Sequence, residues 1–259
     1  MRIVIKIGTS TLTHRSVLLN IRRVEHLCKV LSDLKNAGHE LVIVSSGAIG
    51  VGVGKLSLKE KPADIPTKQA AAAVGQCELM YIYDKLFAEY NHTVAQILIT
   101  GEDIESPKRA KNFHNTIFRL LELGALPIIN ENDTIAVDEI VIGDNDTLGA
   151  IVASTIGADL LILLSDIDGL FTADPQRDPS AKLIPVVEAI TPEMEAAAQG
   201  AGSALGTGGM QTKLAAAKIA TGAGVEMVIA NGTRPDALYD IVEGKPCGTR
   251  FLSKGEKKA

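Results

Sequence analysis

The sequence predicts an α/β fold built on an open, mainly parallel sheet, and three observations lead to that expectation. Short apolar runs that suit buried strands alternate with segments of helical periodicity along the chain. Several of these runs end directly in small, hydroxyl-bearing or acidic residues, and ligands of open parallel sheets bind beyond such strand ends. No internal repeat or linker interrupts the alternation. We therefore expect a single domain over residues 1–259, with an N-terminal lobe of about 1–143 and a C-terminal lobe of about 144–259.

The composition argues against several classes of function. Of 259 residues, 46% are apolar and 22% are charged, which is typical of a folded, soluble protein. A net charge of −5, 3% aromatic residues and the absence of Trp argue against a nucleic-acid partner. The three cysteines form no CxxC pair and the five histidines show no metal-ligand spacing, so neither a disulfide framework nor a zinc site is expected. No signal peptide and no apolar run of about 20 residues is present, so we expect a cytoplasmic protein without a membrane partner.

Two expected strands near the N-terminus end in turns of the same kind. Ile3–Ile7 is an apolar run interrupted by Lys6, and the small residues Gly8-Thr9-Ser10 follow it. Leu41–Val44 is a second apolar run, and Ser45-Ser46-Gly47 follows that one. Glycine lets a backbone N–H group approach a phosphate closely. One such turn is typical of an ordinary strand-to-helix connection, whereas two from neighbouring strands, one of them preceded by a lysine, favour an anion-binding cradle.

The other elements of the N-terminal lobe follow from periodicity and helix caps. Asn20 can cap a helix that runs to about Leu34, because apolar residues recur there at helical spacing, and Cys28 is expected in the core. Gly50–Thr67 is expected to be irregular and to form a lid, an interface or a surface loop. The remaining expected elements are helices from Ala48 onward, over Lys68–Glu89 with a break at Gly75, and over Lys111–Leu123, and strands over Val94–Leu98 and Leu126–Ile129.

The most informative stretch is Ile129–Ala150, which contains six acidic residues and almost no counter-charge. It carries two polar clusters, NEND at 130–133 and GDND at 143–146, with a small hairpin expected over Ala136–Ile142 between them. The first cluster follows an apolar strand. The second precedes a helix expected over Thr147–Ile156, which an Asp or Asn of GDND (Asp144, Asn145 or Asp146) can cap. Either cluster alone is typical of a solvated turn, but the two together, at a strand end and a helix start, favour a ligand site.

The C-terminal lobe is expected to contain a second glycine-rich loop. Gly206–Lys213, GTGGMQTK, offers backbone amides that can wrap a polyphosphate, and Lys213 can reach its terminal charge. The order of a Walker A loop is absent, and the alternative is a flexible surface loop with a solvated lysine. The elements expected around this loop are strands over Leu160–Leu164, Val225–Ile229 and Thr249–Leu252, helices over Pro192–Ala198, Leu214–Ala223 and Pro235–Val242, a loop over Leu170–Pro179 and a disordered tail KGEKKA.

Taken in order, these motifs resemble the amino acid kinase family. The resemblance covers essentially the whole chain, and although each motif is weak alone, six in order are specific. It implies a three-layer αβα sandwich in which the N-terminal lobe holds the amino acid and the C-terminal lobe holds ATP. NEND, GDND and GTGGMxTK together imply ATP-dependent phosphorylation of the side-chain carboxylate of L-glutamate, the first step of proline biosynthesis. The matching segments are KIGTS at 6–10, SSGAI at 45–49, INEND at 129–133, GDND at 143–146, TADP at 172–175 and GTGGMQTK at 206–213.

The resemblance also implies roles for individual residues. Lys6 and Lys213 would contact the transferring phosphoryl group, and Asp146 would orient both lysines. The amino-acid substrate would be bound by Ser46, Asp133 and Asn145. Mg²⁺ would be carried by ATP, with Asp144 reaching it through water and no direct ligand assigned. The residues implied to bind ATP are Lys6, Gly8, Gly47, Ser165, Asp166, Thr207, Gly208, Gly209, Met210, Gln211, Thr212 and Lys213.

Elementary chemistry agrees with such a reaction. A glutamate side chain has a pKa of about 4.3, so its carboxylate is already a nucleophile at neutral pH and needs no general base. None of the five histidines lies in these motifs. Phosphoryl transfer then requires alignment of two anions and neutralisation of the phosphoryl oxygens, which two lysines and a nucleotide-bound Mg²⁺ can supply.

Two other interpretations stay open. A relative acting on another acid or phosphate, such as acetylglutamate or isopentenyl phosphate, would share the motifs, because substrate choice depends on the shape of the pocket. A non-catalytic amino-acid or nucleotide sensor would share the fold, although a sensor needs neither Lys6 nor Lys213. Many family members carry a further C-terminal PUA domain, which resembles an RNA-modification module, and this sequence is expected to lack it. A homo-oligomer (dimer or tetramer) and feedback inhibition by proline are further expectations from the resemblance.

Overall fold

A computed structural model describes residues 1–14, 16, 18–60, 62–135, 144–175, 177–198 and 209–253. Eight strands of these residues form one sheet in the order β3-β4-β2-β1-β5-β7-β8-β6. Each neighbouring pair is parallel except β7 with β8, which confirms the mainly parallel sheet. The strands are β1 (Arg2–Ile7), β2 (Glu40–Ser45), β3 (Val94–Ile99), β4 (Leu126–Glu131), β5 (Leu160–Ser165), β6 (Val186–Val187), β7 (Glu226–Asn231) and β8 (Thr249–Phe251).

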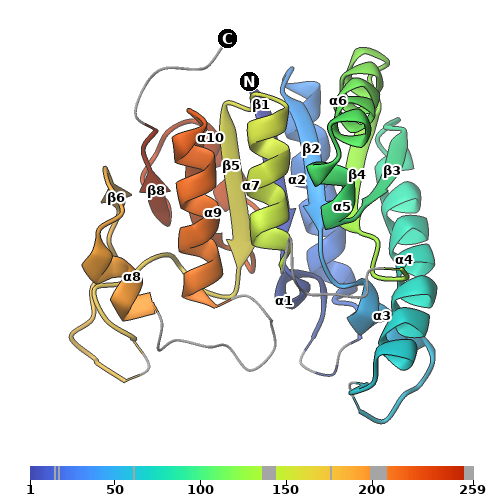
Figure 1. The fold of residues 1–259 in the computed structure, drawn as a ribbon, viewed down its shortest axis with the longest axis horizontal. Helices are drawn as coiled ribbons and strands as arrows, with labels where there is room; N and C mark the ends of the chain where they lie inside the picture. Colours follow the sequence, from blue (N-terminus) through green and yellow to red (C-terminus); the bar gives the residue numbers. More distant parts are fainter. Residues whose placement is uncertain are drawn as a thin grey trace.

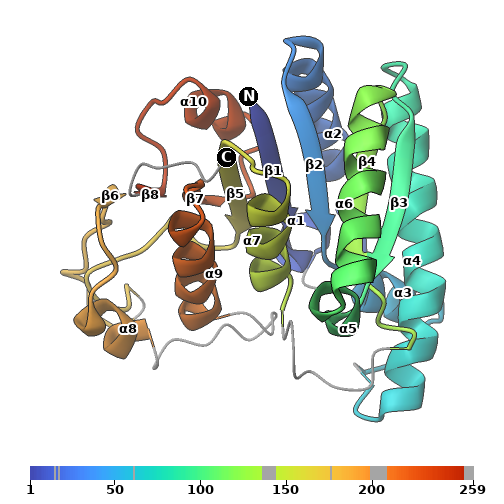
Figure 2. The same cartoon turned by 45° about the horizontal axis from the view of Figure 1, so that its top comes forward.

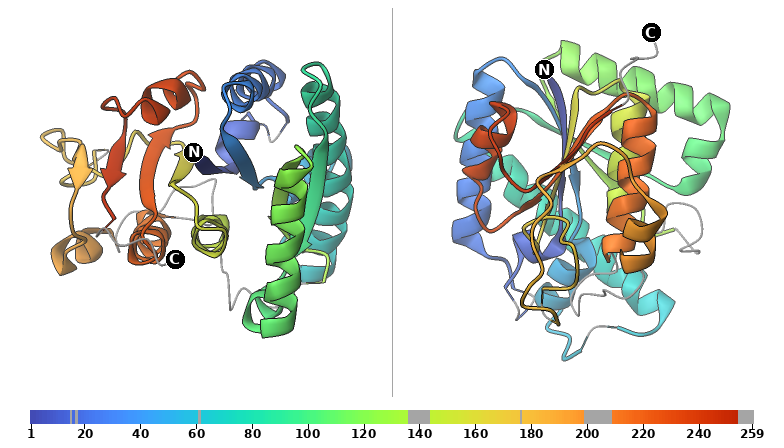
Figure 3. Two further views of the ribbon diagram at one scale, coloured as in Figure 1. Left: turned by 90° about the horizontal axis from the view of Figure 1, so that it is seen from above. Right: turned by 90° about the vertical axis from the view of Figure 1, so that its left-hand side faces the viewer.

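Helices cover both faces of the sheet, which gives the expected three layers (Figures 1 and 3). α2, α4 and α10 pack on one face, and α6, α7 and α9 pack on the other. The described helices are α1 (Thr9–Leu12), α2 (Ile21–Asn36), α3 (Ala48–Lys55), α4 (Ile65–Ala88), α5 (Gly101–Glu105), α6 (Pro107–Glu122), α7 (Asn145–Thr155), α8 (Pro192–Ala198), α9 (Met210–Gly222) and α10 (Ala237–Val242).

Strand β1 lies in the middle of the sheet and sends alternate side chains to the two cores. Ile3, Ile5 and Ile7 contribute to the core beneath α2 and α4, whereas Val4 contributes to the core beneath α7 and α9. Because side chains alternate along a strand, Lys6 also faces the α7 side. This places the charged side chain of Lys6 beneath the start of α7, where Asp146 lies.

The strand order reverses beside β1, which lies between β2 and β5 (Figure 2). The first four strands of the chain extend from β1 in one direction, and the last four extend from β5 in the other. In open α/β sheets, ligands bind beyond the carboxyl ends of the strands at such a switch point. The short helices α1 and α3 begin just after β1 and β2 and lie beyond these strand ends (Figure 1).

One prediction about helices was wrong and another was right only in part, and close packing at glycines accounts for the helical glycines. Gly50–Thr67 was expected to be irregular, which holds for residues 56–60 and 62–64, whereas α3 continues to Lys55 and α4 begins at Ile65 and passes Gly75 without a break. A Cβ at Gly75 would lie 1.7 Å from the carbonyl oxygen of Ala48, and one at Gly52 would lie 1.8 Å from that of Ala71. The two helices therefore touch backbone to backbone, and these glycines serve close packing rather than flexibility.

Smaller differences concern element ends and short elements. The helices α1 and α5 and the strand β6 were not expected, and α9 begins at Met210 rather than at Leu214. Cys28 is buried, as predicted. Among the described residues, no helix has both the length and the apolar character needed to span a bilayer. The hairpin predicted over Ala136–Ile142, residues 200–208 of the glycine-rich region and the tail KGEKKA lie outside the described residues.

The contact between α3 and α4 gives a stability prediction. Gly75→Ala should lower the free energy of unfolding by about 2 kcal/mol or more, because the new methyl group meets backbone atoms that cannot rotate away. Gly222→Ala is the matched control, since a Cβ there meets no atom within 4 Å. It should leave the protein as stable as before or slightly more stable. Denaturant titration of both variants measures the difference, and equal midpoints would refute the packing role.

Candidate functional site

A single carboxylate joins two lysines that lie far apart in the sequence. Lys6 comes from β1, Asp146 from the first turn of α7 and Lys213 from the first turn of α9. The Nζ atom of Lys6 lies 2.6 Å from Oδ1 of Asp146, and Nζ of Lys213 donates to Oδ2 at 3.1 Å. All three residues are buried, with exposed fractions of 8% for Lys6, 4% for Lys213 and 1% for Asp146. The structure thus brings together the three residues predicted to be catalytic.

The electrostatics of this trio favour an anionic ligand. Burial alone would raise the pKa of Asp146, but the charges of Lys6 and Lys213 and their hydrogen bonds outweigh it and hold the pKa below its ordinary value. Asp146 is therefore ionised at neutral pH. One carboxylate against two ammonium groups leaves an excess positive charge in a poorly hydrated place, where it attracts an anion more strongly than it would in water.

Local structure explains how the three side chains meet. Asp144 is the N-cap of α7, since its Oδ1 accepts from the backbone N–H groups of Asp146 at 2.6 Å and Thr147 at 3.0 Å. Of the three capping candidates in GDND, Asp144 is thus the residue that caps. Gly149 lies beside the stem of Lys6, because a Cβ there would approach the Lys6 Cβ to 3.4 Å. The helix α7 therefore fixes Asp146 and leaves room for Lys6 to reach it.

Backbone hydrogen bonds align the ends of the central strands. The N–H of Ser46 donates to the carbonyl of Ile7 at 2.9 Å, and the N–H of Gly8 donates to that of Leu164 at 3.1 Å. Gly8 was expected to offer this N–H to a phosphate, but it already has a partner in β5. At the start of α1 the N–H of Thr11 donates to the carbonyl of Gly8 at 3.0 Å, and the N–H groups before it have no acceptor within the helix. Gly47 has a φ of 102° as the N-cap of α3, a conformation that glycine adopts without strain.

The predicted substrate residues Ser46 and Asn145 are in contact. Nδ2 of Asn145 donates to Oγ of Ser46 at 2.9 Å and to Oδ1 of Asn130 at 3.0 Å. Nδ2 of Asn130 in turn donates to Oε1 of Gln76 on α4 at 2.9 Å. Neither Asn130 nor Gln76 was predicted as a site residue. Asn130 opens the NEND motif and could have been found from it, whereas Gln76 stands within a mostly apolar helix and gave no signal.

Three carboxylates gather beside this polar chain, at the end of β4 and the start of α7. Burial raises the pKa of Asp133, which was predicted to bind substrate. Burial also raises the pKa of Glu131, and the neighbouring charges of Asp133 and Asp144 raise it further. For Asp144, burial and the charge of Asp146 raise the pKa against the opposing hydrogen bonds of α7. Crowded, partly desolvated carboxylates of this kind are stabilised by a bound cation.

The residues predicted to bind nucleotide lie at the ends of β5 and α9. Ser165 is buried at the end of β5, and its hydroxyl donates to the exposed Asp166 at 3.1 Å. Gly209 is the N-cap of α9, and no side chain of the described residues caps this helix, whose N-terminus favours an anion. In that first turn, Thr212 donates to Asp146 at 3.2 Å. Thr207 and Gly208, which were also predicted to bind ATP, lie outside the described residues.

The described residues provide no preformed metal cage. No group of three or more His, Cys, Asp or Glu among them is arranged to hold a metal ion. Asp144, the residue predicted to reach Mg²⁺ through water, uses its carboxylate to cap α7 and to accept from the Thr147 hydroxyl at 3.1 Å. This donor set fits a metal that arrives with its own ligands better than one held by the protein alone.

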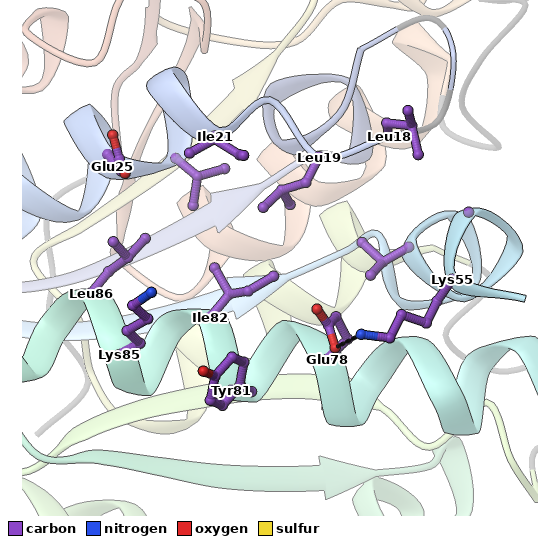
Figure 4. A pocket seen from close by; sticks show the side chains of 13 residues that line it. Leu18, Leu19, Ile21, Glu25, Lys55, Glu78, Tyr81, Ile82, Lys85 and Leu86 are labelled. Atoms are coloured by element: carbon purple, nitrogen blue, oxygen red, sulfur yellow. Dashed lines mark hydrogen bonds and ion pairs between the residues drawn. The ribbon is translucent and has the colours of Figure 1, made fainter.

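A separate apolar hollow of about 440 Å³ lies between α2, α3 and α4 (Figure 4). Leu19, Ile82 and Leu86 line it, and the ion pair between Lys55 and Glu78 stands at one side. None of the predicted site residues is among the described residues that line this hollow. The charged groups described above, rather than this hollow, thus form the candidate site.

Comparison with known protein sequences gives consistent matches. Residues 1–231 match the amino acid kinase family. Among curated proteins, the chain is 54% identical to glutamate 5-kinase from Clostridium perfringens over 257 residues, which is 98% of this chain and 96% of that protein. It is 50% identical to glutamate 5-kinase from Listeria monocytogenes over 260 residues, which is 99% of this chain and 94% of that protein. The match to glutamate 5-kinase from Moorella thermoacetica is 52% identical and covers 98% of this chain but 67% of that longer protein.

Comparison with solved structures supports the fold. Carbamate kinase from Giardia lamblia bound to AMP-PNP superposes with a TM-score of 0.68 at 19% identity, and the match covers 98% of each chain. Isopentenyl phosphate kinase from T. acidophilum superposes with a TM-score of 0.65 at 17% identity, over 97% of this chain and 100% of that one. At these identities the likeness concerns the fold alone.

The raised pKa of Asp133 gives a prediction about stability and pH. Between its unfolded pKa of about 3.9 and its higher folded pKa, the folded state binds more protons, so stability falls as the pH rises through this window. Asp133→Asn removes the charge and should raise the melting temperature at pH 7. The gain should vanish near pH 3, where the natural carboxyl is protonated in both states.

The exposed Asp84 on α4 provides the control for that prediction. Asp84→Asn should change the melting temperature little at either pH, because an exposed carboxylate is solvated in both states. A gain for Asp133→Asn that persists unchanged at pH 3, or no gain at pH 7, would contradict the desolvation of Asp133.

Proposed function

The chain belongs to the amino acid kinase family, and we propose that it transfers the γ-phosphoryl group of ATP to the side-chain carboxylate of L-glutamate. The product is L-glutamyl 5-phosphate, and the reaction is the first step of proline biosynthesis. High identity over nearly the whole chain to glutamate 5-kinases from several bacteria supports this choice of substrate. The observation that carries the proposal is the convergence of Lys6 and Lys213 on Asp146.

In this reaction the substrate supplies its own nucleophile. A carboxylate oxygen of glutamate attacks the γ-phosphorus, a new P–O bond forms and the bond to the β-phosphate oxygen of ADP breaks. Lys6 and Lys213 stabilise the negative charge on the transferring phosphoryl oxygens, and Asp146 keeps both ammonium groups in place before the substrates arrive. The chain needs to move no proton in this step.

The polar groups beside the lysines suit the other end of glutamate. Asp133 is our choice of contact for the α-ammonium group, because a bound cation would relieve the cost of its burial. Ser46 and Asn145 would bind the same substrate, and their mutual hydrogen bond supports a common role. This assignment gives the amino acid to the N-terminal lobe, residues 1–143, together with the start of α7.

ATP is assigned to the C-terminal lobe, residues 144–259. The N-terminus of α9, with Gly209–Lys213, and the end of β5, with Ser165 and Asp166, would hold the nucleotide. Gly47 and the first turn of α1 would offer N–H groups to the phosphates. Mg²⁺ bound to ATP would supply further neutralisation of phosphate charge, and Asp144 would approach it through water. A homo-oligomer in the cytoplasm with feedback inhibition by proline completes the proposal.

A hydroxamate assay tests this function against its alternatives. The protein is incubated with MgATP, one acid from a panel and hydroxylamine, which traps acyl phosphates as hydroxamates. Hydroxamate that depends on L-glutamate is the expected result. Hydroxamate with acetylglutamate alone, or ADP release with a phosphate acceptor alone, would instead indicate a relative with another substrate. Binding of glutamate or ATP without any ADP release would indicate a sensor.

Lys213 provides a direct test of the catalytic assignment. Lys213→Ala should lower kcat by at least about 10²-fold, the range seen when a charge-stabilising donor is lost. Lys218→Ala is the matched control on the same helix, since Lys218 is half-exposed and pairs with Glu195. It should keep kcat within about twofold of the unmodified protein, as surface ion pairs contribute little. A near-normal kcat in Lys213→Ala would remove this lysine from the mechanism.

A further inference from the structure

One buried polar side chain has no role in the site described so far. Gln76 lies in α4, a largely apolar helix, and has an exposed fraction of only 7%. Its Oε1 accepts a hydrogen bond of 2.9 Å from Nδ2 of Asn130, which is 3% exposed. The backbone contact of α3 with α4 at Gly75 holds the neighbouring residue in place. A buried amide is costly unless its partners are fixed, so this pair calls for an explanation beyond core packing.

Gln76, Asn130, Asn145 and Ser46 form a row of hydrogen-bonded side chains. One backbone N–H group determines which atom donates and which accepts in each of these hydrogen bonds. The N–H of Glu131 can only donate, and it donates to Oδ1 of Asn130 at 2.9 Å. This fixes Oδ1 as the acceptor side of the Asn130 amide and leaves Nδ2 to face Gln76. The atom of Gln76 opposite Nδ2 must then be the acceptor Oε1. By the same logic, Asn145 must present its donor Nδ2 to Oδ1 of Asn130.

The donor and acceptor positions fixed in this way determine what Asn145 and Ser46, the last two side chains of the row, can bind. Both hydrogens of the Asn145 amide are used, since Nδ2 donates to Asn130 and Ser46 and also lies 3.4 Å from the carbonyl oxygen of Ser45. The carbonyl Oδ1 of Asn145 is left to accept a hydrogen bond from a ligand. Because Oγ of Ser46 accepts from Asn145, its own hydroxyl hydrogen is left to donate to a ligand oxygen. One acceptor and one donor side by side match the ammonium and carboxylate groups of an α-amino acid.

We propose that Gln76 is a positioning residue that, through Asn130, holds Asn145 and Ser46 in the polarity that recognises the α-amino acid end of the substrate. The inference rests on the proposed function, because it concerns how that substrate is bound. Gln76 touches no reacting group, so its loss affects binding of the amino acid and not the phosphoryl transfer.

The test compares two substitutions of Gln76. Gln76→Met keeps the length of the side chain but removes the acceptor, and it should raise the KM for L-glutamate about tenfold. The KM for ATP and kcat should stay within twofold of the unmodified protein. Gln76→Glu keeps an acceptor oxygen in either protonation state and should restore the KM for glutamate to within about threefold. Gln96→Met, the same change at an exposed position of β3, is the control and should change neither KM.

A double-mutant cycle separates positioning from a general structural effect. If Gln76 acts through Asn145, adding Gln76→Met to Asn145→Ala should change the KM for glutamate by less than twofold. An additional tenfold rise in that background would overturn the proposal, as would a rise in the KM for ATP as large as that for glutamate. So would a failure of Gln76→Glu to restore glutamate binding.

Calorimetric binding of L-glutamate keeps this inference separate from the proposed function. If the unmodified protein binds glutamate but forms no hydroxamate, the proposed function fails, and the comparison of Kd values still tests Gln76. If the unmodified protein forms hydroxamate and Gln76→Met leaves the Kd for glutamate unchanged, the proposed function stands and the role of Gln76 is refuted.

Discussion

The buried carboxylate of Asp146 is the contact on which the rest of the site depends. It joins β1, α7 and α9, which come from distant parts of the chain, by holding Lys6 on one oxygen and Lys213 on the other. Without it, two buried ammonium groups would face each other uncompensated, which costs on the order of 3–5 kcal/mol. The same arrangement supports the proposed function, because one carboxylate balances only one of the two ammonium charges and an anionic phosphoryl group would balance the other. In our proposal, structural stability and phosphate recognition thus share one set of charges.

The fold also places carboxylates whose burial costs free energy at the same end of the sheet. The two cores contain mostly Ile, Val, Leu and Ala, whereas the carboxyl end of β4 holds partly buried carboxylates with raised pKa values. Burial of such groups lowers stability unless a ligand compensates them. The close contact of α3 with α4, made by Gly52 and Gly75, provides a rigid support for this end. We infer that the protein gives up stability where its substrates bind and recovers it in the packing around them.

The sequence predicted well what is local and poorly what depends on packing between distant segments. Strands such as Leu160–Leu164 and the polar clusters at 130–133 and 143–146 were found because short apolar runs and Asn/Asp-rich ends mark them directly. The continuation of α3 to Lys55 was missed because the glycines of GVGVG indicate flexibility in isolation, and only the neighbouring helix shows that they permit close contact. Gln76 could not be predicted at all, since its proposed role depends on Asn130, 54 residues further along the chain. The N–H of Gly8 was assigned to a phosphate because its partner, the carbonyl of Leu164 in β5, lies even further along the chain.

A structure of the protein in a transition-state-like complex tests the central claim most directly. Crystals grown with MgADP, tetrafluoroaluminate and L-glutamate would mimic the phosphoryl group in transfer between the two substrates. Our account predicts that the Nζ atoms of Lys6 and Lys213 both lie within hydrogen-bond distance, about 3 Å, of the fluoroaluminate, with Asp146 still in contact with both. A complex in which the fluoroaluminate lies beyond the reach of either lysine, with glutamate bound and ordered, would contradict it.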